Sequence, residues 1–304
     1  MKWHRQVVGM VATLALAAGA SSSQACSQCM CGTPFPADAL GGVVPIQIRY
    51  GLEERYLSKA NGMDEGPGSE QEREHRVSGF ALWRAADRLA MLGRVPYNVK
   101  ELTESPAGSP SSNETSRGFG DAELLALIGV SHVGGAHGHT LGAVLGVTAP
   151  TGSNVARDET GARLDAHLQP GAGAWSGTAG LNLALATGVG TLEASVLGRT
   201  SGTSAHGYRY GDALLYNLGL SRGAGAGITL LAQLNARSAN RDRQEDGTLG
   251  ANTGGTVVYA SPGLRWRSGF GIGLEAAVQV PVVKSLDGAQ DEHTTGRLSL
   301  SLER

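Results

Sequence analysis

From Gly42 onward, apolar and polar residues alternate along the chain in segments of roughly ten residues. Within Leu141–Ala149, for example, Leu145 and Val147 fall on one face, and Gly146 and Thr148 on the other. A repeat of two predicts a β-strand, and helical spacing does not fit these segments. The pattern is clear in Ile46–Glu53, Leu89–Lys100, Leu141–Ala149, Trp175–Leu185, Ile228–Arg237 and Ile272–Val282.

The connections between strands fall into two classes. Less regular strands are predicted at residues 76–86, 120–130, 191–200, 211–221, 255–267 and 295–303. Short turns are predicted at residues 87, 131–138, 186–190, 222–226 and 268–269. They alternate with longer loops at residues 57–74, 103–118, 150–170, 201–207, 238–254 and 285–294. The longer segments are rich in Gly, Ser, Asn, Asp and Glu, which favour solvated loops.

The fold prediction is all-β: a transmembrane antiparallel β-barrel of about twelve strands over residues 43–304, because short turns alternate with long loops. A bilayer cannot satisfy an open sheet edge, so a spanning sheet closes, with its apolar face toward lipid and its polar face in the lumen. A secreted β-sandwich is the alternative, because its strands also alternate. A sandwich, however, does not require two classes of loop length.

Residues 1–25 are predicted to be a cleaved signal peptide. Lys2 and Arg5 form a basic start, Val7–Ala20 is apolar, and Ser23 and Ala25 supply the small residues that signal peptidase recognises. A membrane-anchoring helix is the alternative, but this apolar run is shorter than the ~20 residues that span a bilayer. Residues 26–42 then form a cysteine-containing segment that we expect to fold into the lumen as a plug.

Composition and charge exclude several classes of protein. The sequence has 25 basic and 27 acidic side chains, and loss of Lys2 and Arg5 leaves 23 against 27, a net charge of −4 with histidine neutral. That balance excludes a nucleic-acid-binding protein. The three cysteines lie within six residues, which excludes a disulfide-stapled secreted domain. No nucleophile elbow and no His-Glu-x-x-His zinc motif is present, so an enzyme is not expected.

Two groups of residues are candidate metal ligands, Cys26, Cys29 and Cys31 at the mature start and His132, His137 and His139 in one predicted turn. Closely spaced thiolates suit Cu(I) or Zn(II), and the predicted topology places both groups at one mouth of the barrel. A disulfide, unused thiols or lipidation of Cys26 are the alternatives for the cysteines, and a solvated turn is the alternative for the histidines. No other cofactor is expected.

Charged residues on the predicted inward faces are expected to line the lumen. Their mixed signs argue against a strongly selective ion pore and favour ladders of ion pairs. The acidic loop at residues 57–74 is a candidate for divalent-cation or lipopolysaccharide contact, with a solvated loop as the alternative. The predicted lumen-lining residues are Arg49, Arg94, Lys100, Glu123, Arg237, Arg265 and Glu275.

Three short stretches resemble a known family. Arg117–Leu124, Leu145–Gly152 and His167–Trp175 resemble paired motifs of the outer-membrane channel family named for the phenol-degradation MetA pathway. The resemblance covers roughly residues 43–304 and implies a 12-stranded barrel that transports a small molecule. The expected partners of such a barrel are outer-membrane lipid, lipopolysaccharide, a small-molecule cargo and the barrel-assembly machinery. The chain ends in Leu302-Glu303-Arg304, whereas such barrels usually end in an aromatic residue.

The functional prediction is passive diffusion of a small solute through a barrel in the outer membrane. Polar inward faces on nearly every predicted strand support a water-filled lumen. A structural or adhesive barrel with a closed lumen is one alternative. A periplasm-facing barrel that handles metal through the cysteines and histidines is the other.

Overall fold

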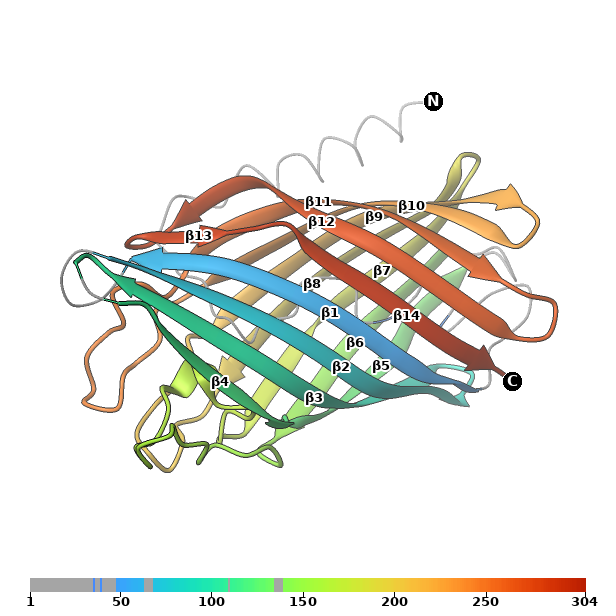
Figure 1. Cartoon of the computed structure of the whole chain (residues 1–304). Helices are drawn as coiled ribbons and strands as arrows, with labels where there is room; N and C mark the ends of the chain where they lie inside the picture. Colours follow the sequence, from blue (N-terminus) through green and yellow to red (C-terminus); the bar gives the residue numbers. More distant parts are fainter. Residues whose placement is uncertain (1–34, 36–38, 40–47, 63–67, 109, 134–138) are drawn as a thin grey trace.

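The computed structural model describes residues 35, 39, 48–62, 68–108, 110–133 and 139–304. This part of the chain forms a closed antiparallel barrel of 12 strands (Figure 1). The barrel closes because β1 (Ile48–Gly62) pairs with both β2 (Gly68–Ala86) and β14 (Thr295–Glu303). Every other wall strand pairs with its neighbours in the sequence.

The predicted strands are present, most of them within a few residues of their expected bounds. The remaining wall strands are β3 (Leu89–Pro106), β5 (Ala122–Val133), β6 (His139–Ala149), β7 (Ser176–Thr187), β8 (Gly190–Ser201), β9 (Ala213–Gly225), β10 (Ile228–Ala239), β11 (Gly255–Arg267) and β12 (Ile272–Leu286). Two shorter strands, β4 (Ser112–Phe119) and β13 (Gln290–Glu292), extend the wall and do not add positions to it.

The wall is interrupted between β4 and β5. The outer half of β3 pairs with β4 and the inner half pairs with β5, and Gly120 and Asp121 lie between the two. Opposite the break, Pro96 has no N–H to donate, and its carbonyl accepts a hydrogen bond from the Gly120 N–H at 2.9 Å. β4 and β5 are therefore one wall position with a kink.

The outer face of the barrel is apolar, and the inner face carries the buried polar side chains together with an apolar cluster. Leu52, Leu145 and Leu234, predicted to face lipid, have exposed fractions of 56%, 51% and 48%. Asn235 and Arg237, on the opposite face of the same strand, are 0% and 3% exposed. A soluble sandwich would bury the leucines instead. This inverted distribution is the one a bilayer imposes on a barrel, so the sandwich alternative is wrong.

Several predicted loops are partly strand. β1 and β2 run through most of residues 57–74, β3 and β4 occupy much of residues 103–118, and β13 lies within residues 285–294. The predicted turns at residues 131–138 and 222–226 are likewise entered by β5 and β9. Cross-strand ion pairs such as Lys59–Glu72, with 2.7 Å between Nζ and Oε2, show the reason. A charged residue that pairs with an opposite charge across the ladder does not argue against a strand.

No helix in the described ranges has the length and apolar character that would let it cross a membrane. The short turns and the C-terminus lie at one end of the barrel, and the long loops lie at the other (Figure 1).

Cysteine labelling tests this topology in a background that lacks the three native cysteines. Cysteines placed at Ser69, Ser111, Ser153 and Asn240, all exposed at the long-loop end, should react with impermeant maleimide on intact cells. Cysteines placed at Asp87, Gly188 and Gly225, exposed at the short-turn end, should react only after the outer membrane is permeabilised. Labelling of both sets on intact cells would contradict the orientation.

Candidate transport path through the barrel

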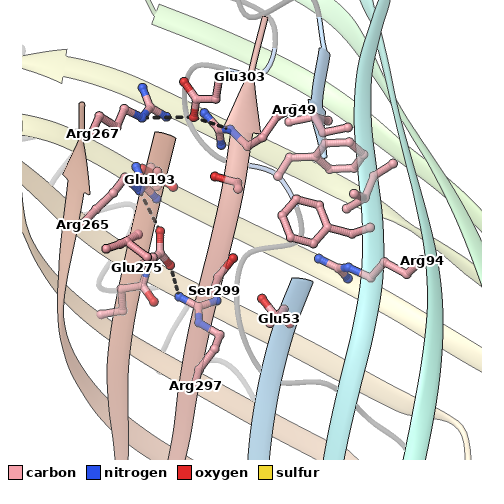
Figure 2. Close-up of a pocket in the computed structure, with 18 residues that line it drawn as sticks. Arg49, Glu53, Arg94, Glu193, Arg265, Arg267, Glu275, Arg297, Ser299 and Glu303 are labelled. Atoms are coloured by element: carbon pink, nitrogen blue, oxygen red, sulfur yellow. Dashed lines mark hydrogen bonds and ion pairs between the residues drawn. The ribbon is translucent and has the colours of Figure 1, made fainter. Parts of the chain in front are cut away.

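A cavity of about 100 Å³ lies inside the barrel toward the short-turn end (Figure 2). We call it the inner cavity. Phe35, Phe80, Leu82 and Leu92 form its apolar wall. Phe35 is fully buried, although it precedes the first wall strand by more than ten residues. Its side chain belongs to the predicted N-terminal segment and lies against the barrel interior.

The lining of the inner cavity also carries two Arg–Glu–Arg bridges (Figure 2). Glu303 lies 2.6 Å from Nε of Arg49 and 3.2 Å from Nε of Arg267. Glu275 accepts from Nε of Arg265 at 2.7 Å and also pairs with Arg297. Each carboxylate therefore serves two guanidinium groups.

A second cavity of about 50 Å³ lies farther toward the long loops. Arg94 lines both this middle cavity and the inner cavity. Its guanidinium lies 3.2 Å from Glu123 on the facing position of β5. Pro170 lines the far side of the middle cavity, so the loop between β6 and β7 reaches into the barrel.

That loop, residues 150–175, is the mouth loop. Side chains of the wall hold its carbonyls: Lys100 Nζ donates to His167 O at 2.6 Å, Asn98 Nδ2 donates to Pro170 O at 2.7 Å, and Ser116 donates to Leu168 O. Its one turn of 3-10 helix, Ala166–Leu168, has both Ala166 and Leu168 buried. The mouth loop thus closes much of the long-loop end from within.

The three stretches that resemble the channel family meet where the mouth loop leaves and rejoins the wall. Asp121 accepts from the N–H of Gly152 at 2.9 Å and from that of Ala172 at 2.7 Å. A Cβ on Gly152 would lie 2.8 Å from Cα of Gly120, so only glycine allows this approach. These residues shape the loop.

A polar side chain braces the mouth loop internally. Gln169 is 1% exposed, and its amide accepts from Ala156 N at 2.8 Å and donates to Leu164 O at 2.7 Å. The amide thereby replaces backbone pairing that the loop lacks.

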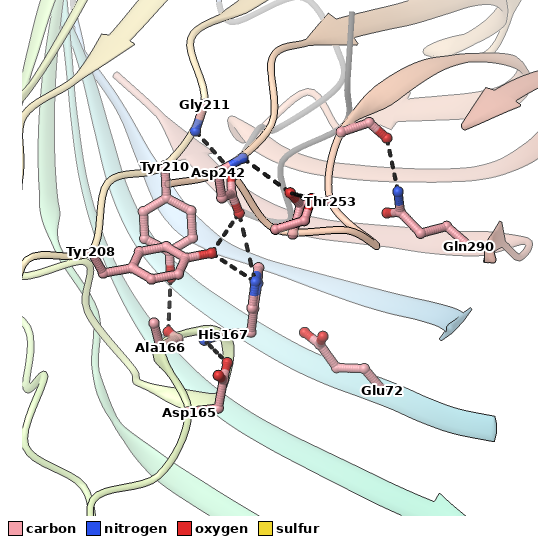
Figure 3. Close-up of polar contacts among 12 residues, drawn as sticks. Glu72, Asp165, Ala166, His167, Tyr208, Tyr210, Gly211, Asp242, Thr253 and Gln290 are labelled. Atoms are coloured by element: carbon pink, nitrogen blue, oxygen red, sulfur yellow. Dashed lines mark hydrogen bonds and ion pairs between the residues drawn. The ribbon is translucent and has the colours of Figure 1, made fainter. Parts of the chain in front are cut away.

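A cluster of His167, Tyr208, Tyr210 and Asp242 joins three of the long loops (Figure 3). We call it the mouth cluster. The Tyr208 hydroxyl donates to Asp242 Oδ2 at 2.7 Å and lies 2.7 Å from His167 Nε2. Asp242 is 0% exposed and also accepts from the Gly211 N–H at 2.7 Å. The Tyr210 hydroxyl donates to Ala166 O at 2.8 Å. The cluster therefore ties residues 201–212 and 240–254 to the mouth loop.

An outer cavity of about 340 Å³ lies beyond the mouth cluster. Arg209, Arg241 and Arg243 line it together with Asp212. Burial alone would raise the pKa of Asp212, but a hydrogen bond from the Thr200 hydroxyl and the Arg209 guanidinium outweigh it and hold that pKa below its ordinary value. Asp212 is therefore an anion at neutral pH, and it neutralises one of the three guanidiniums.

Neutral polar residues form a ladder on the wall strands β8 to β14. Asn235 Nδ2 donates to Asn217 Oδ1 at 2.9 Å, and Asn217 Nδ2 donates to Ser195 Oγ at 2.9 Å. Ser261 donates to Asn235 Oδ1 at 2.6 Å, and Thr295 continues the ladder through Gln279. The sequence prediction named only charged residues as lumen-lining. The alternation of residues along these strands also places the neutral polar side chains of this ladder on the inward face.

The structure places the predicted lumen-lining residues in two groups. Arg49, Arg94, Arg265 and Glu275 line the inner cavity, and Glu123 lines the middle cavity beside Arg94. The other two contact loop or rim segments. Lys100 binds the mouth loop, and Arg237 pairs with Glu292 of β13.

The candidate metal ligands lie mostly outside the described residues. Cys26, Cys29, Cys31 and His137 lie outside the described residues. For His132, only its position in β5 is described. His139 begins β6 and is exposed. Within the described part of the chain, no group of three His, Cys, Asp or Glu side chains could hold a metal ion. The metal site stays a prediction.

The fold is that of known outer-membrane barrels. The chain is similar to an outer membrane channel from Pseudomonas putida F1, with a TM-score of 0.65 and 15% identity over 90% of this chain and 100% of that one. It is also similar to the translocator domain of the autotransporter NalP from Neisseria meningitidis, with a TM-score of 0.52 and 12% identity over 88% and 91% of the two chains. The chain has an outer-membrane β-barrel fold.

No protein-family model and no curated protein matches the sequence. The resemblance to the phenol-degradation channel family therefore stays a prediction, because likeness at this level of identity concerns the fold alone.

Proposed function

We propose that the chain is an outer-membrane channel through which a small solute diffuses down its gradient. One observation carries this proposal: two charged cavities, the inner and the middle, lie inside a single barrel and share Arg94 in their linings. A barrel that served only as an anchor would gain stability from a filled lumen, since cavities forfeit packing. The described residues reserve this space for water or solute.

The closed state of the channel is set by loops. The hydrogen-bonded wall is rigid, whereas the mouth loop is held by a limited number of polar contacts that water can replace. We infer that loop movement admits the solute and that the apolar band keeps the barrel in outer-membrane lipid. Contact with lipopolysaccharide and insertion by the barrel-assembly machinery belong to the same proposal.

Planar-bilayer recording of the purified full-length protein tests the function. Discrete conductance steps, together with swelling of liposomes in an iso-osmotic small solute, are expected. A matched control is the same preparation heated until the barrel unfolds. A folded protein that is electrically silent and leaves liposomes solute-tight would instead support a structural or adhesive barrel with a closed lumen.

A further inference from the structure

The balance of charge around the inner cavity differs from that of the chain. Acidic side chains outnumber basic ones overall, 27 to 25, yet five arginines and four glutamates are found among the described residues that line this cavity. Four of those arginines share two carboxylates, Glu275 and Glu303. A guanidinium is a planar fork of five donors and can bind more than one carboxylate oxygen. With Glu53 and Glu193 included, the arginines of the lining exceed its glutamates by one, so the cavity carries one net positive charge and can receive one anion.

Part of the lining of the same cavity is apolar. Phe80 and Leu82 come from β2 and Leu92 from β3, and Phe35 completes the surface. Arg49, which belongs to one of the bridges, is the cross-strand partner of Leu82, and Arg94 is that of Phe80, so apolar and guanidinium groups are adjacent in this lining. The apolar surface continues beyond the cavity, because Leu125, Leu127 and Val144 of the neighbouring strands belong to the same buried cluster.

The volume limits the occupant. A cavity of about 100 Å³ is somewhat smaller than the roughly 150 Å³ space that admits one benzene molecule. The enclosed space is therefore too small for a ring with a carboxylate, so an occupant of about one ring or a short alkyl chain extends from the inner cavity into the lumen.

We infer that the inner cavity binds a small organic carboxylate with an apolar body, its carboxylate against the arginine bridges and its body against Phe80 and Phe35. This inference rests on the proposed channel function and names the solute class. The outer cavity supports it, because three arginines and one aspartate line that cavity at the opposite mouth. The preference for carboxylates comes from one local binding site. It therefore does not require the whole lumen, whose charges are mixed in sign, to select anions.

Binding is tested on the folded full-length protein in detergent by titration calorimetry. Sodium benzoate is the probe, and three relatives separate its features: benzamide lacks the charge, acetate lacks the ring, and benzylammonium reverses the charge. We expect saturable binding of benzoate that is about tenfold or more tighter than that of each relative, the effect of one charge-assisted contact. Comparable affinity for benzamide or for acetate would overturn the inference.

Variants locate the site. Arg297→Gln should weaken benzoate binding by about tenfold, and Arg297→Lys, which keeps the charge, should lose less. Phe80→Ala should weaken benzoate binding and leave acetate unchanged. Arg222→Gln is the matched control, because Arg222 is exposed at the short-turn end. Folding of each variant is checked by its heat-dependent mobility in SDS gels. If neither Arg297→Gln nor Phe80→Ala changes benzoate binding, the proposed site is wrong.

The two proposals fail differently. Benzoate binding with no conductance or uptake would overturn the channel function and leave the binding site. Conductance and uptake without any preference for benzoate would overturn the binding site and leave the channel.

Discussion

Replacement of Asp242 by alanine should open the long-loop mouth and raise single-channel conductance several-fold. Asp242 is fully buried and accepts from both the Tyr208 hydroxyl and the Gly211 N–H. Each buried donor that loses its acceptor costs on the order of 1–3 kcal/mol, so the closed arrangement of the loops loses much of its advantage over an open one. Asp242 Oδ2 also lies 3.6 Å from His167 Nε2, so the loss of Asp242 removes one of the contacts that hold the mouth loop.

Two readouts separate an open mouth from a misfolded barrel. Conductance in planar bilayers should rise, and limited proteolysis should cut residues 201–212 faster while the wall stays protected. Asp246→Ala is the matched control on the same loop, because Asp246 is exposed and accepts only from Thr248 within its own turn. Asp242→Asn keeps an acceptor and should have an intermediate effect. Unchanged conductance and unchanged proteolysis in Asp242→Ala would show that the mouth cluster does not hold the loops.

Replacement of Glu275 by alanine should destabilise the barrel and shift its ion preference toward anions. The substitution removes the carboxylate that Arg265 and Arg297 share and leaves the positive charges in the lumen. Removal of one partner from a buried ion pair costs about 3–5 kcal/mol. The three side chains are 14–20% exposed, so solvent screening places the expected loss at the lower end of that range.

The temperature at which the folded band disappears from SDS gels reports this stability, and the reversal potential under a salt gradient reports the ion preference. Asp291→Ala is the matched control, because Asp291 pairs with Lys284 at the rim and both side chains are well exposed. Exposed pairs contribute roughly 0–1 kcal/mol, so the control should unfold close to the wild-type temperature. Equal losses in the two variants would argue against a structural role for the Arg–Glu–Arg bridge.

Register decided which charged residues meet. Arg265 and Glu275 were both predicted to face inward, but their pairing follows from the turn at residues 268–271, which sets them directly opposite. Arg49 and Glu303 are opposite each other only because the barrel closes β1 onto β14. Strand parity shows on which face a side chain lies. The partner across the strand depends on turn geometry and on closure.

The sequence by itself determined the wall of this protein. A repeat of two placed the strands, as in the predicted Ile228–Arg237 and the observed β10, Ile228–Ala239. Lipid on one side and water on the other impose that repeat residue by residue, so it can be found from local pattern alone.

Only the tertiary structure decided how the ends of the barrel are closed. His167, Tyr208 and Asp242 are separated by tens of residues in segments without periodicity, yet their side chains meet in the mouth cluster. The buried Phe35 likewise carries no local sign of its place among lumen residues. Loops have no repeating environment to imprint a pattern, and their contacts depend on where the closed wall places their ends.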